Sequence, residues 1–176
     1  MSHPLDLLHL AGRRRITPVR QSEAAECGLA CLAMVAGYHG QKTDIAALRR
    51  MFPISLKGMS LRTLIGMADD LGFTSRAIRA EIDDLPEVTL PAILHWNLNH
   101  FVVLTAIERR AKGTRYRICD PARGELLCSF EDLSRSYTGV TLELMPSERF
   151  QQRDDRKPLR ISQMWTRLIG LPQALL

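Results

Sequence analysis

The 176-residue sequence is poor in cysteine, in aromatic residues and in long hydrophobic runs. Its four cysteines are too few, in a chain of this length, for the disulfide framework of a small secreted protein. No apolar run approaches the roughly 20 residues of a transmembrane helix. The first apolar run is short and precedes its arginines, whereas a signal peptide has the opposite order. These absences predict free thiols in a reducing, cytoplasmic compartment.

Nucleic-acid motifs are also absent, although the formal net charge is +5. Neither an aromatic-rich RNA-binding motif nor zinc-finger spacing accompanies the charge. Much of the positive excess lies near the two ends, at residues 13–15 and 149–167. A basic surface can meet nucleic acid, anionic lipid or an acidic partner. We favour a solvated surface for the middle of the chain and predict no nucleic-acid partner.

The rest of the composition, with 45% hydrophobic and 24% charged residues, is that of an ordinary globular protein. A core of this size needs no disulfide or metal to stabilise it. We expect one domain at residues 16–150, after a basic N-terminal segment at 1–15. Residues 151–176 are predicted to form a polar linker and then an amphipathic helix around Trp165. That helix could pack on the same chain or lie on a membrane surface.

Helices are predicted in the first half of the sequence. Residues 24–36 are rich in Ala, Leu and Met, and Gly37 is a plausible stop. Thr43 or Asp44 can cap a second helix, and Ser60 can cap a third. The third shows apolar residues at helical spacing.

Strands are predicted in the second half, where the hydrophobic period changes. The expected strands are residues 74–80, 91–96, 101–108, 115–119, 125–130 and 140–145, with a short helix at 131–137. Helices first and strands after favour an α+β fold with an antiparallel sheet. In that fold the start of the first helix lies against the sheet.

Cys27 is the first residue of chemical interest. A thiol in the first turn of a helix faces unpaired backbone N–H groups, which stabilise the nucleophilic thiolate. Cys31 lies one turn further along in an apolar context and is expected in the core. Glu23 and Glu26 would oppose thiolate formation if they lay close, so Cys27 needs a cationic partner. The alternative is that Cys27 is buried and inert.

Gln21 precedes Cys27 by six residues, which lets its side-chain amide return beside the thiol. Together with the backbone N–H of Cys27 it could form an oxyanion hole. The alternative is that Gln21 is an ordinary loop residue.

His100 is the candidate base. It follows a polar turn and leads directly into an apolar strand, which is a rigid mount for a general base. His95 lies within the preceding strand and is the less favoured candidate. Asp120 ends a neighbouring strand before Pro121, where it can accept a hydrogen bond from the imidazole and fix its tautomer. An Asp-Pro turn without a catalytic role is the alternative.

Taken together, these segments resemble the N-terminal peptidase domain of the bacterial ABC exporters that process and secrete bacteriocins. The stretch QSEAAECGLACLAM, residues 21–34, resembles the cysteine motif of that family. HFVVL from His100 and DPARG from Asp120 resemble its histidine and aspartate motifs. The likeness extends over residues 16–150, with no departure at the four active positions.

The resemblance implies a papain-like fold and a cysteine endopeptidase. Such an enzyme removes the leader of a bacteriocin or microcin precursor after a Gly-Gly or Gly-Ala site. Cys27 would attack, His100 would move the proton, Asp120 would orient His100, and Gln21 would stabilise the oxyanion. The implied domain needs no metal or other cofactor.

The resemblance also implies partners. The double-glycine leader peptide would be one, and the transmembrane and ATP-binding domains of an ABC exporter would be the others, on the cytoplasmic side of the bacterial inner membrane. ATP would serve only the parent transporter, and the sequence holds no P-loop GxxxxGK[ST].

Recognition of a helical leader calls for an apolar groove, in which the spaced apolar side chains of the leader lie. The candidate groove residues are Met59, Leu64, Met67 and Trp96. Methionine suits a groove that accepts several leaders. The alternative is that these side chains belong to the core.

Two other classes of function stay open. A non-catalytic module would hold the leader without cleaving it, but the presence of all four catalytic positions argues against this. A metal site could use Cys27, Cys31, His95 and His100. The C-x-x-x-C spacing on one helix, however, differs from the usual C-x-x-C pairs of zinc sites.

Overall fold

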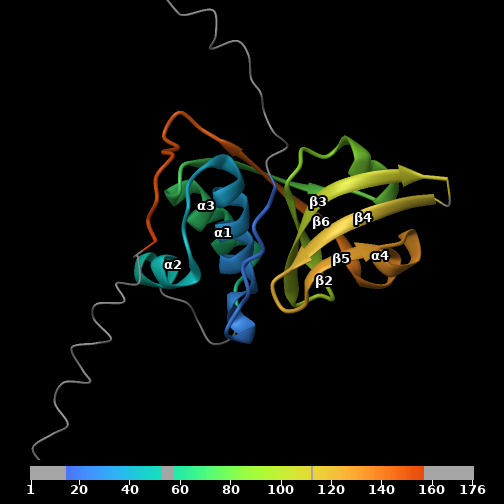
Figure 1. Ribbon diagram of the computed structural model, residues 1–176, viewed down its shortest axis with the longest axis horizontal. Coiled ribbons are helices and arrows are strands. Elements are labelled where there is room, and N and C mark those ends of the chain that lie inside the picture. The colour runs from blue at the N-terminus through green and yellow to red at the C-terminus, as the bar shows by residue number, and fades with distance from the viewer. Residues whose placement is uncertain (1–14, 53–57, 112, 157–176) are drawn as a thin grey trace, which may run out of the picture.

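The computed structural model describes residues 15–52, 58–111 and 113–156. The predicted helix around Trp165 and most of the basic segment at 1–15 lie outside these ranges. Within the described residues, no helix is both long and apolar enough to cross a bilayer. Figure 1 shows the first three α-helices gathered on one side of a twisted sheet.

The helical side is formed by η2 (Ala24–Glu26), α1 (Cys27–His39), α2 (Ile45–Met51) and α3 (Leu61–Asp70). As predicted, Ser60 and Asp44 are N-caps, and each side chain accepts a hydrogen bond from a backbone N–H three residues ahead. The predicted stop at Gly37 is wrong. Helix α1 continues to His39 and ends at Gly40, whose φ of 104° is the left-handed conformation that glycine adopts without strain.

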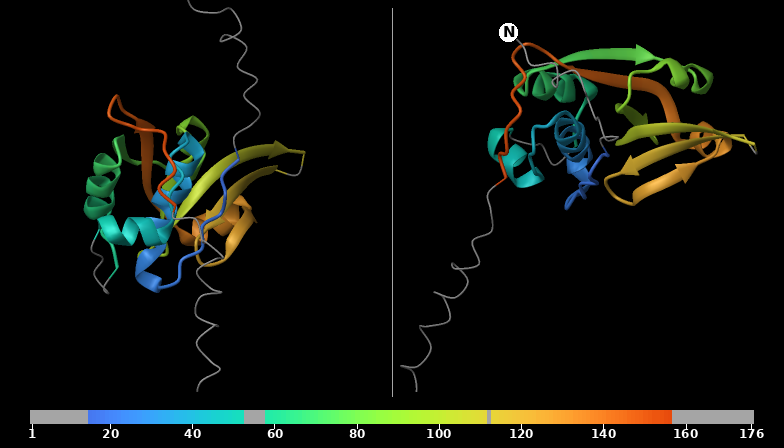
Figure 2. Two further views of the ribbon diagram at one scale, coloured as in Figure 1. Left: turned by 60° about the vertical axis from the view of Figure 1, so that its left-hand side comes forward. Right: turned by 45° about the horizontal axis from the view of Figure 1, so that its top comes forward.

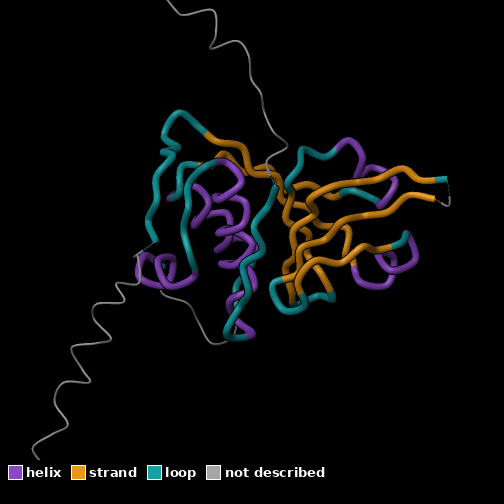
Figure 3. The backbone as a smooth tube through the Cα atoms, viewed as in Figure 1, coloured by secondary structure: helices purple, strands orange, loops and turns teal. Residues whose placement is uncertain are grey.

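The sheet has six strands in the order β1-β6-β2-β3-β4-β5, and every neighbouring pair is antiparallel. The strands are β1 (Phe73–Arg79), β2 (Ala92–Trp96), β3 (His100–Arg110), β4 (Gly113–Asp120), β5 (Gly124–Cys128) and β6 (Tyr137–Pro146). A 3-10 helix, η3 (Ile82–Glu87), and a short helix, α4 (Phe130–Ser136), complete the fold. Figure 3 shows η3 and α4 on the far side of the strands from α1–α3. The predicted α+β order is therefore confirmed.

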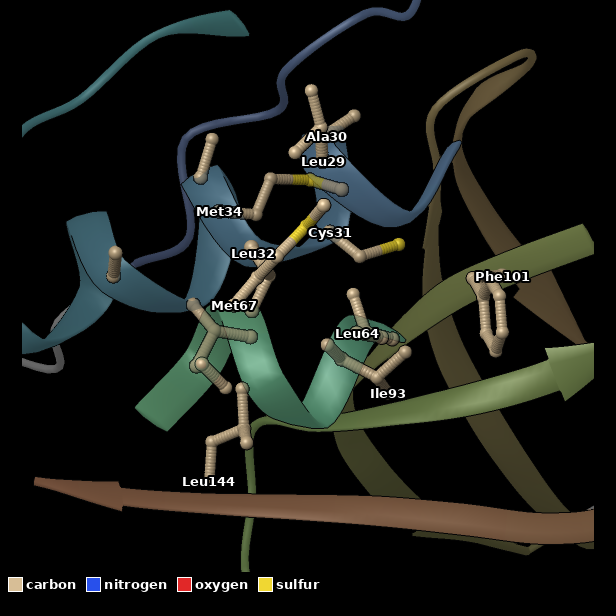
Figure 4. Packing of buried hydrophobic residues seen from close by; sticks show 14 of the residues in the cluster. Leu29, Ala30, Cys31, Leu32, Met34, Leu64, Met67, Ile93, Phe101 and Leu144 are labelled. Carbon is tan, nitrogen blue, oxygen red and sulfur yellow. The ribbon is translucent and has the colours of Figure 1, made fainter. Parts of the chain in front are cut away.

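The sheet separates two hydrophobic clusters, because successive strand residues point to opposite faces. In β3, Phe101 and Val103 belong to the cluster that contains α1, whereas Val102 and Leu104 belong to the cluster under η3 and α4. The larger cluster, part of which Figure 4 shows, buries α1 almost completely along residues 27–36. Helix α1 contacts β3 directly, so its N-terminus is fixed against the sheet.

The chain after β6 returns to the helical side and runs down to α2, as Figures 1 and 2 show. We call residues 147–156 the strap. The Ser147 N–H donates to Gly72 O at 2.9 Å, the Lys42 N–H donates to Arg153 O at 2.7 Å, and Asp155 N–H donates to Lys42 O at 2.8 Å. The predicted boundary at residue 150 therefore does not end the folded unit, since backbone hydrogen bonds continue to residue 155.

Candidate active site

A buried carboxylate fixes the turn that leads into α1. Glu26, 3% exposed, accepts hydrogen bonds from the backbone N–H groups of Ser22 and Glu23 at 2.9 Å and pairs with Arg49. Burial would raise the pKa of Glu26, but these donors and Arg49 hold it below its ordinary value. The Arg49 guanidinium thus neutralises the carboxylate of Glu26, the residue before Cys27. Sequence reasoning missed the pair because the two residues lie 23 positions apart.

Cys27 is the first residue of α1, and its side chain is only 3% exposed. Cys27 thus lies at the N-terminus of α1, where the first backbone N–H groups have no acceptor within the helix. The next residue is Gly28, and a Cβ at this position would lie 2.7 Å from the Met59 sulfur. Glycine therefore permits Met59 to pack directly against the backbone beside the thiol.

His100 and Asp120 come together from adjacent strands. His100 begins β3 and Asp120 ends β4, and His100 Nε2 lies 2.8 Å from Asp120 Oδ1. The turn before His100 contains Asn97 and Leu98, whose φ values of 47° and 65° are both left-handed. This tight turn brings the chain back so that His100 pairs with Trp96 of β2.

The protonation of His100 depends on both of its neighbours. Its pKa is raised to about 9, first by the hydrogen bond to Asp120 and second by a hydrogen bond to Cys27, while burial opposes the rise. Asp120 occupies Nε2, which leaves Nδ1 as the ring nitrogen available to the thiol. At neutral pH the ring is therefore an imidazolium, which is the cationic partner that Cys27 requires.

Asp120 stays ionised in a largely enclosed position. Its side chain is 3% exposed, and the N–H of Ala122 donates to Oδ1 at 2.8 Å. Burial would raise the pKa of Asp120, but the hydrogen bonds from His100 and Ala122 hold it below its ordinary value. The carboxylate can then accept from the His100 ring in one fixed orientation.

Gln21 lies beside the turn that follows Asp120. Its backbone N–H donates to Pro121 O at 3.1 Å. Its side-chain oxygen is buried and has no hydrogen-bond partner among the described residues. The structure therefore brings Gln21 to the same turn as Asp120, across a sequence separation of about a hundred residues.

The other three cysteines are buried as well. Cys31 is fully buried, and burial raises its pKa well above the ordinary range. Burial also raises the pKa of Cys119 to about 11 and raises that of Cys128. These three are protonated, core-type thiols, as the sequence predicted for Cys31.

An open pocket of about 470 Å³ is lined by the chain neighbours of His100, Asn99 and Phe101, and by Met59, which lies next to Gly28. It is lined by Gly58, Met59, Ser60, Leu61, His95, Leu98, Asn99, Phe101 and Val140. Leu98 stands out because it is 81% exposed. Sequence reasoning missed Leu98, although an apolar residue between two asparagines in a turn is an unusual feature that could have drawn attention to it.

The candidate groove residues fall in different places. Met59 lines the pocket, but Leu64 and Met67 are buried in the core, at 0% and 6% exposure. Trp96 is also buried, in the cluster on the other face of the sheet. All three therefore belong to the core, Leu64 and Met67 because the apolar stripe of α3 faces inward, and Trp96 because it points from β2 into the opposite cluster. His95 lines the pocket and bonds Thr138 Oγ1 through Nδ1 at 2.8 Å.

The helix-then-sheet order and the thiol–imidazole pair at their junction define a cysteine peptidase with a papain-like fold. Within that class the chain belongs to the Peptidase C39 family, whose family model matches residues 15–149.

Similar proteins agree with this placement. The chain is 40% identical over 171 residues to the colicin V secretion/processing ATP-binding protein CvaB of Escherichia coli, a match that covers 97% of the chain and 24% of CvaB. It is 32% identical over 154 residues to the transport/processing ATP-binding protein ComA of Streptococcus pneumoniae strain R6, covering 83% of the chain and 21% of ComA. The chain thus spans about a quarter of the length of these relatives. The predicted resemblance to bacteriocin exporters is confirmed.

Solved structures give the same class. A double glycine motif protease from an AMS/PCAT transporter, solved in complex with the leader peptide, is 34% identical with a TM-score of 0.69, covering 78% of this chain and 96% of that one. The peptidase domain of Streptococcus ComA is 27% identical with a TM-score of 0.66, covering 76% of this chain and all of that one. The predicted papain-like fold is confirmed.

Proposed function

We propose that this chain is the leader peptidase of a bacteriocin or microcin exporter and cleaves after a Gly-Gly or Gly-Ala site. The single observation that carries the proposal is the Cys27–His100–Asp120 arrangement, at the N-terminus of α1 and on β3 and β4. The likeness to a double glycine motif protease that was solved with its leader supports the choice of substrate.

In the proposed reaction the Cys27 thiolate attacks the carbonyl carbon of the second residue of the site. The peptide oxygen becomes an oxyanion, and the protonated His100 gives its proton to the leaving amine nitrogen. The C–N bond breaks, leaving the leader as a thioester on Cys27. His100 then takes a proton from water as the water oxygen attacks the thioester carbon. The C–S bond breaks, the leader leaves as a carboxylic acid whose proton passes to the released amine, and the Cys27 thiolate and the His100 imidazolium are restored.

Asp120 and Gln21 support this sequence in different ways. Asp120 holds the His100 ring and stabilises its charged form, which agrees with the raised pKa of His100. Gln21 would donate from its side-chain amide to the oxyanion, where charge develops only during the reaction. The scheme uses thiol and imidazole chemistry throughout and calls on no metal or nucleotide.

The pocket beside the site suits the leader. Met59, Leu98 and Phe101 give it apolar walls, and Met59 reaches the backbone next to Cys27. Apolar side chains of a helical leader would lie there and direct the small residues of the cleavage site to the thiol. A cleft too narrow for side chains beside the cut would reject residues larger than glycine or alanine.

The relatives support a place in an export system. CvaB and ComA combine processing with transport in one ATP-binding protein, of which this chain matches about a quarter. The proposed partners are therefore the transmembrane and ATP-binding domains of an ABC exporter, with the peptidase on the cytoplasmic side of the bacterial inner membrane. ATP would be used by those domains and not by peptide hydrolysis.

A cleavage assay on a synthetic precursor with a double-glycine leader tests the proposal. We expect cleavage after the second glycine, read by mass spectrometry, that stops with iodoacetamide and continues with EDTA. Cys27→Ala should abolish cleavage while leader binding, measured by fluorescence anisotropy, stays intact. Cys31→Ala is the matched control and should stay active. Binding without cleavage by the wild type would instead indicate a leader-binding module, and loss of cleavage with EDTA alone would indicate a metal enzyme.

A further inference from the structure

The segment before α1 is attached to the turn that carries Asp120. Residues 15–21 form no helix or strand and run alongside α1, as Figures 1 and 2 show. Two hydrogen bonds join them to the turn between β4 and β5. The Gln21 N–H donates to Pro121 O at 3.1 Å, and Arg20 Nη1 donates to Ala122 O at 2.9 Å. Neighbouring residues of one segment thus bind neighbouring carbonyls of the other.

The turn accommodates the arginine through a glycine. A Cβ on Gly124 would lie 3.1 Å from Arg20 Nη2, which is tighter than ordinary contact. Gly124 also has a φ of 93°, a conformation that side-chain-bearing residues rarely adopt. The turn therefore leaves space at the place where the guanidinium of Arg20 lies.

The same turn holds the base. Ala122 donates its N–H to Asp120 Oδ1 at 2.8 Å, and that oxygen lies 2.8 Å from His100 Nε2. Ala122 is therefore a shared point, since its N–H serves Asp120 and its carbonyl serves Arg20. A short run of backbone links the orientation of His100 to the position of Gln21.

We propose that Arg20 is a positioning residue, and we call its hydrogen bond to Ala122 the latch. The latch holds the segment that carries Gln21 against the turn that carries Asp120, so that the oxyanion donor keeps a fixed position relative to the base, His100. The inference rests on the proposed catalytic role of Gln21. Without Arg20, one of the two hydrogen bonds that join the segment to the turn is lost, which lets the segment and the Gln21 amide shift relative to His100. A displacement of about 1 Å in a catalytic group can cost about a hundredfold in rate.

The latch lies at the surface, so its removal should affect turnover without much effect on the free energy of unfolding. The Arg20–Ala122 bond is exposed, and exposed hydrogen bonds contribute little to the free energy of unfolding. Because Arg20 would act through Gln21, its removal cannot cost more than removal of Gln21 itself, about a hundredfold in kcat. We expect Arg20→Ala to lower kcat about tenfold, with KM and Tm nearly unchanged.

A double-mutant cycle on the leader-cleavage assay tests this mechanism. Arg20→Ala should lower kcat in the wild-type background and have almost no further effect in Gln21→Ala, because the group it positions is gone. Arg20→Lys, which keeps one donor, should recover part of the rate. Arg79→Ala is the matched control, an exposed arginine on β1 at the opposite edge of the sheet. The latch would be overturned if the double variant lost kcat by the product of the two single losses. It would also be overturned if Arg20→Ala had a normal kcat.

A second readout needs no substrate. Hydrogen exchange of the Gln21 backbone amide, followed by NMR, should quicken in Arg20→Ala and stay unchanged in Arg79→Ala. Unchanged exchange in Arg20→Ala would overturn the latch even if the enzyme cleaves the leader. If instead the wild type fails to cleave while the exchange differs as expected, the proposed function fails, and with it the catalytic purpose of the latch, whereas the attachment of the Gln21 segment by Arg20 is supported.

Discussion

At the scale of single residues, the central feature is the charge on His100. Its hydrogen bond to Asp120 is the largest cause of a pKa of about 9, well above the ordinary 6.5. Because this pKa is raised on folding, the pair stabilises the fold fully below pH 6.5, and that contribution is lost as the pH rises through about 9. The imidazolium form of His100 is lost over the same range.

Asp120→Asn tests this assignment. We expect kcat/KM of the wild type to fall as the pH rises through about 9. In the variant this alkaline fall should begin at a lower pH, because the hydrogen bond that contributes most to the raised pKa of His100 is gone. Turnover at neutral pH should fall by about tenfold or more, with KM little changed, since the groove is untouched. A pH–rate profile of both enzymes measures this.

Asp70→Asn, an exposed carboxylate at the end of α3, is the control and should keep the wild-type profile. If Asp120→Asn changed KM alone and left the alkaline limb in place, Asp120 would be a substrate contact or a turn residue instead of the partner of His100.

At the scale of elements, the pocket is assembled from the chain before α3 and the β2–β3 turn. Met59 precedes the N-cap of α3, and Leu98 lies in the turn, with Phe101 following it in β3. Helix α3 itself turns Leu64 and Met67 into the core, so the groove begins at its N-terminal end and not along its length. The β2–β3 turn and β3 therefore carry both the proposed base, His100, and part of the proposed leader site.

Met59→Ala should weaken leader binding more than turnover. The loss of part of one apolar wall corresponds to about 1 kcal/mol, or roughly a fivefold increase in KM. Met145→Ala removes an exposed methionine from the end of β6, remote from the pocket-lining Val140, and serves as the control. Steady-state kinetics on the precursor peptide separate the two parameters. A fall in kcat at constant KM would instead indicate that Met59 positions Cys27, through its packing against Gly28.

At the scale of the whole molecule, the strap attaches the chain after β6 to the helical side, at Gly72 and Lys42. Phe150 packs on Phe73 with ring centroids 4.7 Å apart and on His39 at 6.3 Å. Gly72 allows this approach, because a Cβ there would lie 2.8 Å from the Phe150 backbone. The strap thus covers the junction of α1 and β1.

Phe150→Ala should cost stability without costing catalysis. A partly buried phenylalanine corresponds to about 2 kcal/mol of the free energy of unfolding, or roughly 4–8 °C in Tm. We expect kcat to stay at the wild-type value below the unfolding transition. Phe130→Ala, at the exposed start of α4, should change Tm far less. Thermal unfolding followed by circular dichroism measures both variants, and an unchanged Tm for Phe150→Ala would show that the strap does not stabilise the domain.

Much of this protein is determined by the sequence itself. The caps at Asp44 and Ser60, the strand periods and the helix-then-sheet order were predictable, because each depends on residues within a few positions of one another. The choice of Cys27, His100 and Asp120 as candidates was also predictable, since each sits at a recognisable element boundary. The end of α1 was not, because glycine is tolerated inside a helix at a cost of about 1 kcal/mol and only packing selects Gly40 over Gly37.

Only the tertiary structure decided which distant residues meet. The periodicity of α3 shows an apolar stripe, but not whether that stripe faces the core or a groove, and the answer for Leu64 and Met67 is the core. The Glu26–Arg49 pair, the strap and the bond from Arg20 to Ala122 join residues that are far apart in the chain. Such contacts follow from how the helices and the sheet pack together, and no local pattern encodes them.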